Sequence, residues 1–392
     1  MAGKITYLWK LTTRSASTPF RIKGHRLSAG FWIRFTKDVV NEPPKDEDDL
    51  SENRYVYDPL PDGKHIRLLE LHPGSGDDPL SGTLRSVSLA DSAYGRFDAL
   101  SYVWGDMHRP GAATIALGSG QNLRIAPNLT DALRQLRHSK RSRVIWVDAI
   151  CINQQDDAER AQQVPFMAEI YTHCHSVLVW LGLPTPHTRL GMEILAFLAH
   201  SSSSIGAGDD APWAREQNDV VEAAINDVLG RPYFSRLWVV QEAALAPRVV
   251  MHVGRAKLEW DRGAATRRFL MRIKMAELAP SWQTSALRDA VDFRPVRELL
   301  EQSLAAEARR TGTPEPTTLL DVVHSIRNRN VMDPRDRIYG VMSLVTPAEV
   351  AGLVPDYSVS WEETYRRFYD LVESRVLRDP GTTLEDVKGV GG

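Results

Sequence analysis

The end of a predicted strand at residues 97–104 carries side chains that could bind a ligand: Ser101, Tyr102, Trp104, Gly105 and Asp106. Open α/β sheets bind ligands at the carboxyl ends of their strands. Ser101 and Asp106 could hydrogen-bond a ribose or a phosphate, and Gly105 would let the ligand approach the backbone closely. The alternative is that Tyr102 and Trp104 belong to the core and that the Gly-Asp pair only forms a turn.

Two carboxylates elsewhere in the chain are candidates for chemistry. Asp148 ends a second predicted strand, where it could orient a ribose or another side chain, or else cap the following turn. Glu242 lies in a predicted helix four residues after Trp238, so the two side chains share a helix face and the indole could line the same pocket. The alternative is that Glu242 pairs with Arg236 or Arg248 and only holds the fold together.

Cys151 and Cys174 are the only two cysteines, and histidines flank Cys174 at positions 173 and 175. These spacings do not match a standard zinc finger, and no oxyanion-binding motif accompanies a Cys–His pair. We expect buried structural thiols, and no metal. So few cysteines also indicate a reducing compartment.

The composition is that of an ordinary globular protein, with 392 residues, 43% hydrophobic residues and a net charge of −2. It excludes collagen-like, wholly disordered and disulfide-rich classes and gives no reason to expect binding to nucleic acid. No apolar run approaches the length of a membrane span. We therefore expect a cytoplasmic protein. The acid-poor, basic start of the chain leaves mitochondrial targeting as an alternative.

The expected organisation has three parts. Residues 1–52 form a poorly ordered extension, basic and then acidic, residues 53–260 an α/β core, and residues 261–392 a mainly helical region. Nearly continuous apolar runs at 144–148 and 176–181 are typical of strands buried on both faces. Strands and helices alternate between residues 97 and 181, which predicts a parallel sheet of about five strands. The other expected strands cover 66–71, 84–89, 97–104, 114–117, 122–125 and 248–253.

Local signals place the helices. Asn128 is expected to cap one helix, and Asp156 another that reaches about residue 172. Pro165 lies inside the second helix and is expected either to kink it or to mark its true first turn. The further helices that we expect cover residues 233–245, 263–279, 287–309 and 361–377.

Several blocks of the sequence together resemble the fungal heterokaryon incompatibility (HET) domain family. They are Ala-Leu-Ser-Tyr-Val-Trp-Gly-Asp at 99–106, Ile-Trp-Val-Asp-Ala-Ile-Cys-Ile-Asn-Gln at 145–154, Val-Trp-Leu-Gly at 179–182, Arg-Leu-Trp-Val-Val-Gln-Glu at 236–242 and Asp-Pro-Arg-Asp-Arg-Ile-Tyr at 333–339. The resemblance spans about residues 55–370. It implies a role in self/non-self recognition and regulated cell death.

HET domains are in turn similar to TIR domains, which have a flavodoxin-like parallel sheet. Enzymatic TIR domains cleave NAD with a glutamate four residues after a tryptophan, the spacing of Trp238 and Glu242. The resemblance therefore implies that Glu242 is catalytic and that the protein becomes active on self-assembly. Cleavage of the nicotinamide–ribose bond places positive charge on the ribose, which one carboxylate can stabilise.

The sequence thus predicts a TIR-like α/β protein with an N-terminal β elaboration and a C-terminal helical part. It would act as a homo-oligomeric cell-death effector that cleaves NAD as a substrate, needs no cofactor and meets an incompatibility partner protein. The residues expected to bind the substrate are Ser101, Tyr102, Trp104, Gly105, Asp106, Asp148 and Trp238. The alternative is a non-catalytic module that signals by oligomerising or recruiting partners.

Overall fold

A computed structural model describes residues 53–91, 96–105, 111, 113–118, 120–201, 211–214, 216–279, 287–313 and 318–376. Residues 53–392 form one unit. The extension expected at 1–52 lies outside the described residues. Within the described ranges, no helix is both long enough and apolar enough to cross a membrane.

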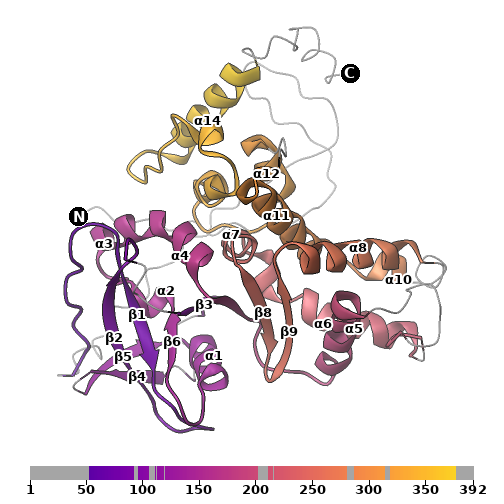
Figure 1. The fold of residues 1–392 in the computed structure, drawn as a ribbon, viewed down its shortest axis with the longest axis horizontal. Helices are drawn as coiled ribbons and strands as arrows, with labels where there is room; N and C mark the ends of the chain where they lie inside the picture. Colours follow the sequence, from indigo (N-terminus) through magenta and orange to yellow (C-terminus); the bar gives the residue numbers. More distant parts are fainter. Residues whose placement is uncertain are drawn as a thin grey trace, which may run out of the picture. The chain divides into compact units, whose positions relative to one another are not determined.

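A nine-stranded mixed sheet forms the core of this unit (Figure 1). Its strand order is β5-β4-β2-β1-β6-β3-β7-β8-β9. The strands are β1 (His65–Leu71), β2 (Leu80–Ser88), β3 (Asp98–Tyr102), β4 (Ala113–Leu117), β5 (Gln121–Ile125), β6 (Arg143–Trp146), β7 (Ser176–Trp180), β8 (Arg248–Val253) and β9 (Ala256–Asp261).

The middle of the sheet is parallel and confirms the predicted α/β class. Strand β3 pairs in parallel with β6 on one side and β7 on the other, and β7 pairs in parallel with β8. Taken in chain order, these four strands lie second-first-third-fourth, as in the flavodoxin-like order. The sheet is wider than expected, because antiparallel pairing adds β1 and β2 at one end and β9 at the other. Strand β9 was not predicted.

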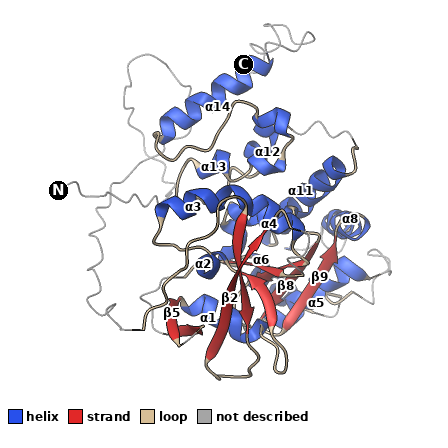
Figure 2. Ribbon diagram, turned by 60° about the vertical axis from the view of Figure 1, so that its left-hand side comes forward, coloured by secondary structure: helices blue, strands red, loops and turns tan. Residues whose placement is uncertain are grey.

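Helices surround the sheet and extend beyond it (Figure 2). They are α1 (Pro127–Leu136), α2 (Asp148–Cys151), α3 (Asp157–Gln163), α4 (Met167–His173), α5 (Thr188–His200), α6 (Asn218–Leu229), α7 (Trp238–Ala244), α8 (Ala264–Leu278), α10 (Leu287–Ala290), α11 (Arg294–Arg310), α12 (Leu319–Ser325), α13 (Asp336–Tyr339) and α14 (Trp361–Val376). The helices predicted after residue 260 are present, with the one expected at 287–309 divided into α10 and α11.

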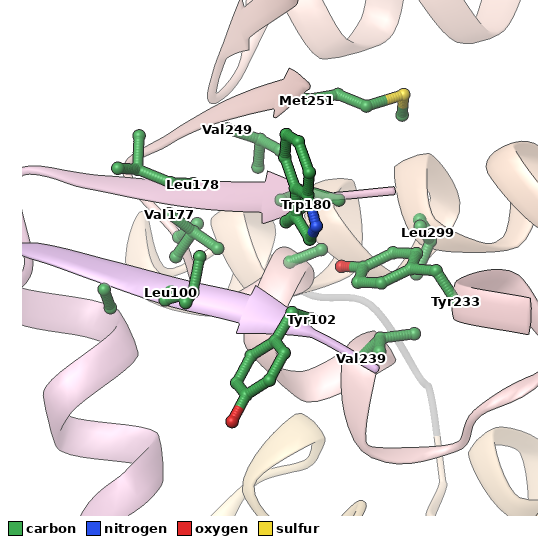
Figure 3. Close-up of a cluster of buried hydrophobic side chains, with 14 of the residues drawn as sticks. Leu100, Tyr102, Val177, Leu178, Trp180, Tyr233, Val239, Val249, Met251 and Leu299 are labelled. Carbon is green, nitrogen blue, oxygen red and sulfur yellow. The ribbon is translucent and has the colours of Figure 1, made fainter. Parts of the chain in front are cut away.

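The helices α1 and α7 lie on opposite faces of the sheet. Successive side chains of a strand point to opposite faces. Trp180 of β7 pairs with Tyr102 of β3, so its side chain lies on the face opposite that of Ser101. The Trp180 indole donates a hydrogen bond to Asn128 at the start of α1, whereas Ser101 donates to Glu242 of α7. The apolar side chains around these strands pack into one buried cluster (Figure 3).

Two predicted helices differ in detail. Asn128 does not cap α1, which begins at Pro127 after Ala126; the Asn128 side chain bonds instead to the Val103 carbonyl and to the Trp180 indole. The helix expected at 156–172 does begin at the Asp156 cap. Around Pro165 it is interrupted and not merely kinked, because a short 3-10 turn at Val164–Phe166 separates α3 from α4.

A buried arginine fixes the segment that carries α2 and α3 against β1. Arg67 is 4% exposed and donates to both carboxylate oxygens of Glu159, at 2.6 and 3.0 Å. It also donates to the backbone carbonyls of Cys151 and Asp58. The guanidinium group therefore ties three segments together, and its loss would leave the Glu159 carboxylate without its partner.

We predict that Arg67→Met lowers the free energy of unfolding by about 3–5 kcal/mol, because breaking a buried ion pair leaves an uncompensated charge. Urea denaturation measures this change. Arg160→Ala is the matched control, since Arg160 and its partner Asp157 are exposed and its loss should cost less than about 1 kcal/mol. Equal losses in the two variants would contradict the assignment.

Candidate functional site

Polar groups gather at the carboxyl ends of β3 and β6. Chain order reverses direction at β3, because β6 lies on one side of it and β7 on the other. Such a switch point is where open α/β sheets bind ligands. Ser101 and Tyr102 end β3, and Asp148 begins α2 directly after β6. The structure thus brings together three of the predicted site residues.

Glu242 is the most buried charged side chain of this group, only 4% exposed. It comes from the second turn of α7, which packs against β3 and β7. The Ser101 hydroxyl donates a hydrogen bond to its carboxylate, and the same hydroxyl lies 2.9 Å from the hydroxyl of Tyr233. Tyr233 was not singled out from the sequence, although it lies in the same predicted helix as Glu242. Glu242, Ser101 and Tyr233 therefore form a buried polar triad.

Burial raises the pKa of Glu242 from 4.5 to about 7. The positive charge of Arg236 and the Ser101 hydrogen bond oppose this effect, and the negative charge of Asp148 adds to it. A carboxyl group in this state exchanges its proton near neutral pH, which is the range in which acid–base or electrostatic catalysis operates.

The predicted alternative of an ion pair to Glu242 is not formed with either arginine. Arg248 pairs instead with Glu259 of β9, at 2.6 Å. Arg236 donates to the backbone carbonyl of Tyr102 and acts on the Glu242 carboxyl only through its charge. Glu242 does link α7 to β3, but through the hydroxyl of Ser101.

Asp148 and Trp104 form the outer part of the site. The Trp104 indole is 47% exposed and donates a 2.7 Å hydrogen bond to the Asp148 carboxylate. Asp148 also accepts from the backbone of Ala149, and its carbonyl accepts from Gln154. Burial raises the pKa of Asp148, against the effect of these hydrogen bonds. Asp148 thus both orients an exposed aromatic ring and braces the following turn, the two roles that the sequence left open.

The indole N–H of Trp238 bonds to a residue outside the triad. It donates to the Asp336 carboxylate at 3.1 Å, and that carboxylate also accepts from the Tyr357 hydroxyl at 2.7 Å. Asp336 was not predicted as a site residue, although it lies in a sequence block used for the family resemblance. Trp238 therefore connects α7 to the C-terminal helices.

Gly105 approaches a helix, the start of α1. A Cβ atom there would lie 3.3 Å from the Cβ atom of Ala126, a tight contact to which the neighbouring residues would have to adjust by a few tenths of an ångström. Asp106 lies outside the described residues. Both cysteines are buried, and burial raises the pKa of each thiol to about 12. This agrees with the expected buried thiols.

Comparison with known proteins shows what these residues are similar to. The family model described as "Heterokaryon incompatibility protein (HET)" matches residues 97–242, from the residue before β3 to Glu242 itself. The segment that carries the candidate site is therefore similar to HET domains.

A curated relative is similar over a longer range than the HET model. The chain is 27% identical over 339 residues to "Heterokaryon incompatibility protein 6, OR allele" of Neurospora crassa. The alignment covers 76% of this chain and 49% of the relative, so the chain spans about half the length of that protein. No solved structure matches the chain. The similarity to TIR domains stays a prediction.

The raised pKa of Glu242 predicts a pH-dependent stability. The folded chain binds this proton more tightly than the unfolded chain, so the free energy of unfolding falls as the pH rises from about 4.5 to about 7, by roughly 3 kcal/mol in all. Glu242→Gln lacks this titration. Its stability relative to the wild type should therefore increase between pH 5 and pH 8, as measured by urea denaturation. Glu169→Gln, on an exposed ion pair with Lys64, should show no such trend, and parallel pH profiles of the wild type and Glu242→Gln would contradict the prediction.

Proposed function

We propose that this protein is an effector of fungal heterokaryon incompatibility, which triggers regulated cell death on non-self recognition. This role is supported by the match to the HET model at residues 97–242 and by the similarity to Heterokaryon incompatibility protein 6 of Neurospora crassa. An incompatibility partner protein would supply the signal.

We propose further that the effector acts by cleaving NAD with Glu242. The observation that carries this proposal is a buried carboxyl group at the switch point of the sheet, with a pKa of about 7. In this reaction the bond between ribose C1′ and the nicotinamide nitrogen breaks, and its electron pair stays on nicotinamide. Water then adds to C1′ and releases a proton, giving ADP-ribose. The ionised Glu242 stabilises the positive charge that develops on the ribose.

The neighbouring residues would bind the rest of the substrate. Trp104 presents a half-exposed ring that Asp148 holds in place, a surface on which a planar base stacks. Ser101 already hydrogen-bonds the carboxylate and would position it against the ribose hydroxyls. Tyr102, Gly105, Asp106 and Trp238 complete the set of substrate-binding residues predicted from the sequence.

Burial of Glu242 requires an activating step. The side chain is 4% exposed, so a ribose reaches it only after the segments around it rearrange. Self-assembly of the chain into a homo-oligomer is the trigger that we propose, since contacts between copies would provide the free energy for that rearrangement.

We predict that the assembled wild type releases nicotinamide from NAD and that Glu242→Gln reduces this rate at least 100-fold, the usual cost of removing one stabilising group. The chain is assayed at high concentration and also as a fusion to an oligomerising coiled coil, with light scattering to establish assembly and circular dichroism to establish folding. Glu169→Gln is the matched control and should keep the wild-type rate. An assembled, folded wild type that releases no nicotinamide would refute NAD cleavage.

The rate should also depend on pH through Glu242. Because the ionised carboxylate is the active form, the rate of nicotinamide release should rise about tenfold per pH unit below pH 7 and level off above it. A rate that falls as the pH rises through 7 would assign Glu242 the role of a proton donor instead.

The burial of Glu242 also favours a second candidate function, a non-catalytic module that signals by recruiting partners. In that case the triad only joins α7 to β3. Ser101→Ala and Glu242→Gln would then change only the free energy of unfolding, and Ser101→Ala would lower it. Cell death in a fungal host would persist in any Glu242 variant that folds.

A further inference from the structure

A cavity opens on the face of the central strands that is turned away from Glu242. It has a volume of about 560 Å³ and its lining includes Asp98 and Ser176, the first residues of β3 and β7. From there it runs along the sheet over Leu178 of β7 and over Val250 and His252 of β8, beside β9. Ser101 and the triad lie on the other face, so the two places are distinct.

The face of the sheet that lines this cavity is the one that carries α1. Leu178 and Val250 pair in the register, and Leu178 lies two residues before Trp180, whose indole bonds to α1. Both side chains line the cavity and give it an apolar patch. His138, just after the end of α1, lines it as well.

The charged groups of the cavity are mostly cations. Five Arg or Lys side chains line it against two carboxylates, Asp98 and Glu259. The carboxylates are already engaged, because Asp98 pairs with Arg143 at 2.5 Å and Glu259 with Arg248 at 2.6 Å. Across the described ranges, no carboxylate lies within ion-pair distance of the remaining three cations, Arg96, Arg141 and Lys257.

Two histidines in the lining respond to this positive charge. Burial, together with the charges of Arg143 and Lys257, lowers the pKa of His252 to about 4, against the opposing charge of Glu259. Burial likewise lowers the pKa of His138, again with Arg143 and Arg141 acting in the same direction. A neutral histidine beside several cations marks a site whose potential favours an anion.

The shape and chemistry restrict the class of anion. A volume of this size suits a small molecule, and guanidinium groups match the oxygens of phosphate in a bidentate geometry. The lining has one aromatic ring besides the histidines, that of Phe97, and it is only 2% exposed, so the cavity offers no platform for stacking a base. Recognition therefore rests on charge.

We propose that this cavity binds the adjacent phosphates of an oligophosphate, through Arg96, Arg141 and Lys257. The phosphates can belong to a free oligophosphate or to a nucleotide, and the absence of a stacking ring in the lining means that a nucleoside adds little to the affinity. The site is independent of the reaction proposed for Glu242.

Isothermal titration calorimetry of the full chain with sodium tripolyphosphate, at fixed ionic strength and pH 7.5, tests the proposal. The double variant Arg141→Ala/Lys257→Ala should bind at least tenfold more weakly, because two exposed cations leave the cavity without disturbing an ion pair. The control Arg189→Ala/Lys274→Ala removes the same net charge from exposed ion pairs elsewhere and should keep the wild-type affinity. ATP in a parallel titration should bind no more tightly than tripolyphosphate; tighter binding would indicate a nucleotide site.

A third variant gives an effect of opposite sign. Glu259→Gln removes a carboxylate from the lining and leaves Arg248 with only the longer, 3.7 Å ion pair to Asp261, so it should tighten tripolyphosphate binding severalfold, with folding verified by circular dichroism. No binding to the wild type at millimolar tripolyphosphate would overturn the proposal. Equal losses in the two double variants would overturn it as well, because they would indicate unspecific attraction by surface charge.

Discussion

A carboxyl group buried without an ion-pair partner is the constraint on which the centre of this protein depends. Glu242 accepts a hydrogen bond from the Ser101 hydroxyl, which in turn contacts Tyr233. This fixes α7 over the end of β3, since any shift would leave a polar group unsatisfied in an apolar surrounding. Burying a carboxyl group without a charged partner is unfavourable for folding. Its location at the switch point of the sheet is the reason to connect it with chemistry.

The parallel order of β6, β3, β7 and β8 separates two kinds of charge. At the carboxyl ends the strands bring together Asp148 and Glu242, whose pKa values are both raised by burial. The cavity on the other face, which begins at the opposite ends of β3 and β7, collects cations instead. In a parallel sheet all strands run in the same direction, so residues at corresponding places in several strands converge at one edge. The same topology thus creates both environments.

Much of this arrangement could be predicted from the sequence, because the central strands are continuous apolar runs and the family blocks lie at their ends. The alternating pattern of Ala-Lys-Leu-Glu-Trp-Asp at 256–261 is also typical of a strand, β9, but it is a weaker signal than the apolar run of β8 before it. The helix expected at 233–245 is interrupted because Arg236 takes an extended conformation and forms a bridge to Asn330. No glycine or proline marks this break; its cause is a contact almost a hundred residues away in the sequence.

The site shows a similar limit. The resemblance to TIR domains selects Glu242 by its spacing from Trp238. The two side chains nevertheless bond to different partners, Glu242 to Ser101 and Trp238 to Asp336. Neither partner follows from helical periodicity, because periodicity defines a face and not what packs against it. Similarly, asparagine is a residue type that commonly caps helices, but here Pro127 occupies the first helical position. The side-chain amide of Asn128 bonds instead to Val103, just after β3, and to Trp180 of β7.

The two edges of the sheet bear on how copies of this chain can meet. Strand β9 alternates Lys257, Glu259 and Asp261 with buried residues, and charged side chains along an edge strand discourage the addition of another strand. At the other edge, the backbone of Asn53 and Tyr55 hydrogen-bonds Asn122 of β5. Growth by joining sheets edge to edge is therefore disfavoured at both edges that the structure describes. Among the described elements, the helices and loops are the surfaces that remain for contact between copies, and contacts there would not extend the sheet into a continuous β-fibril.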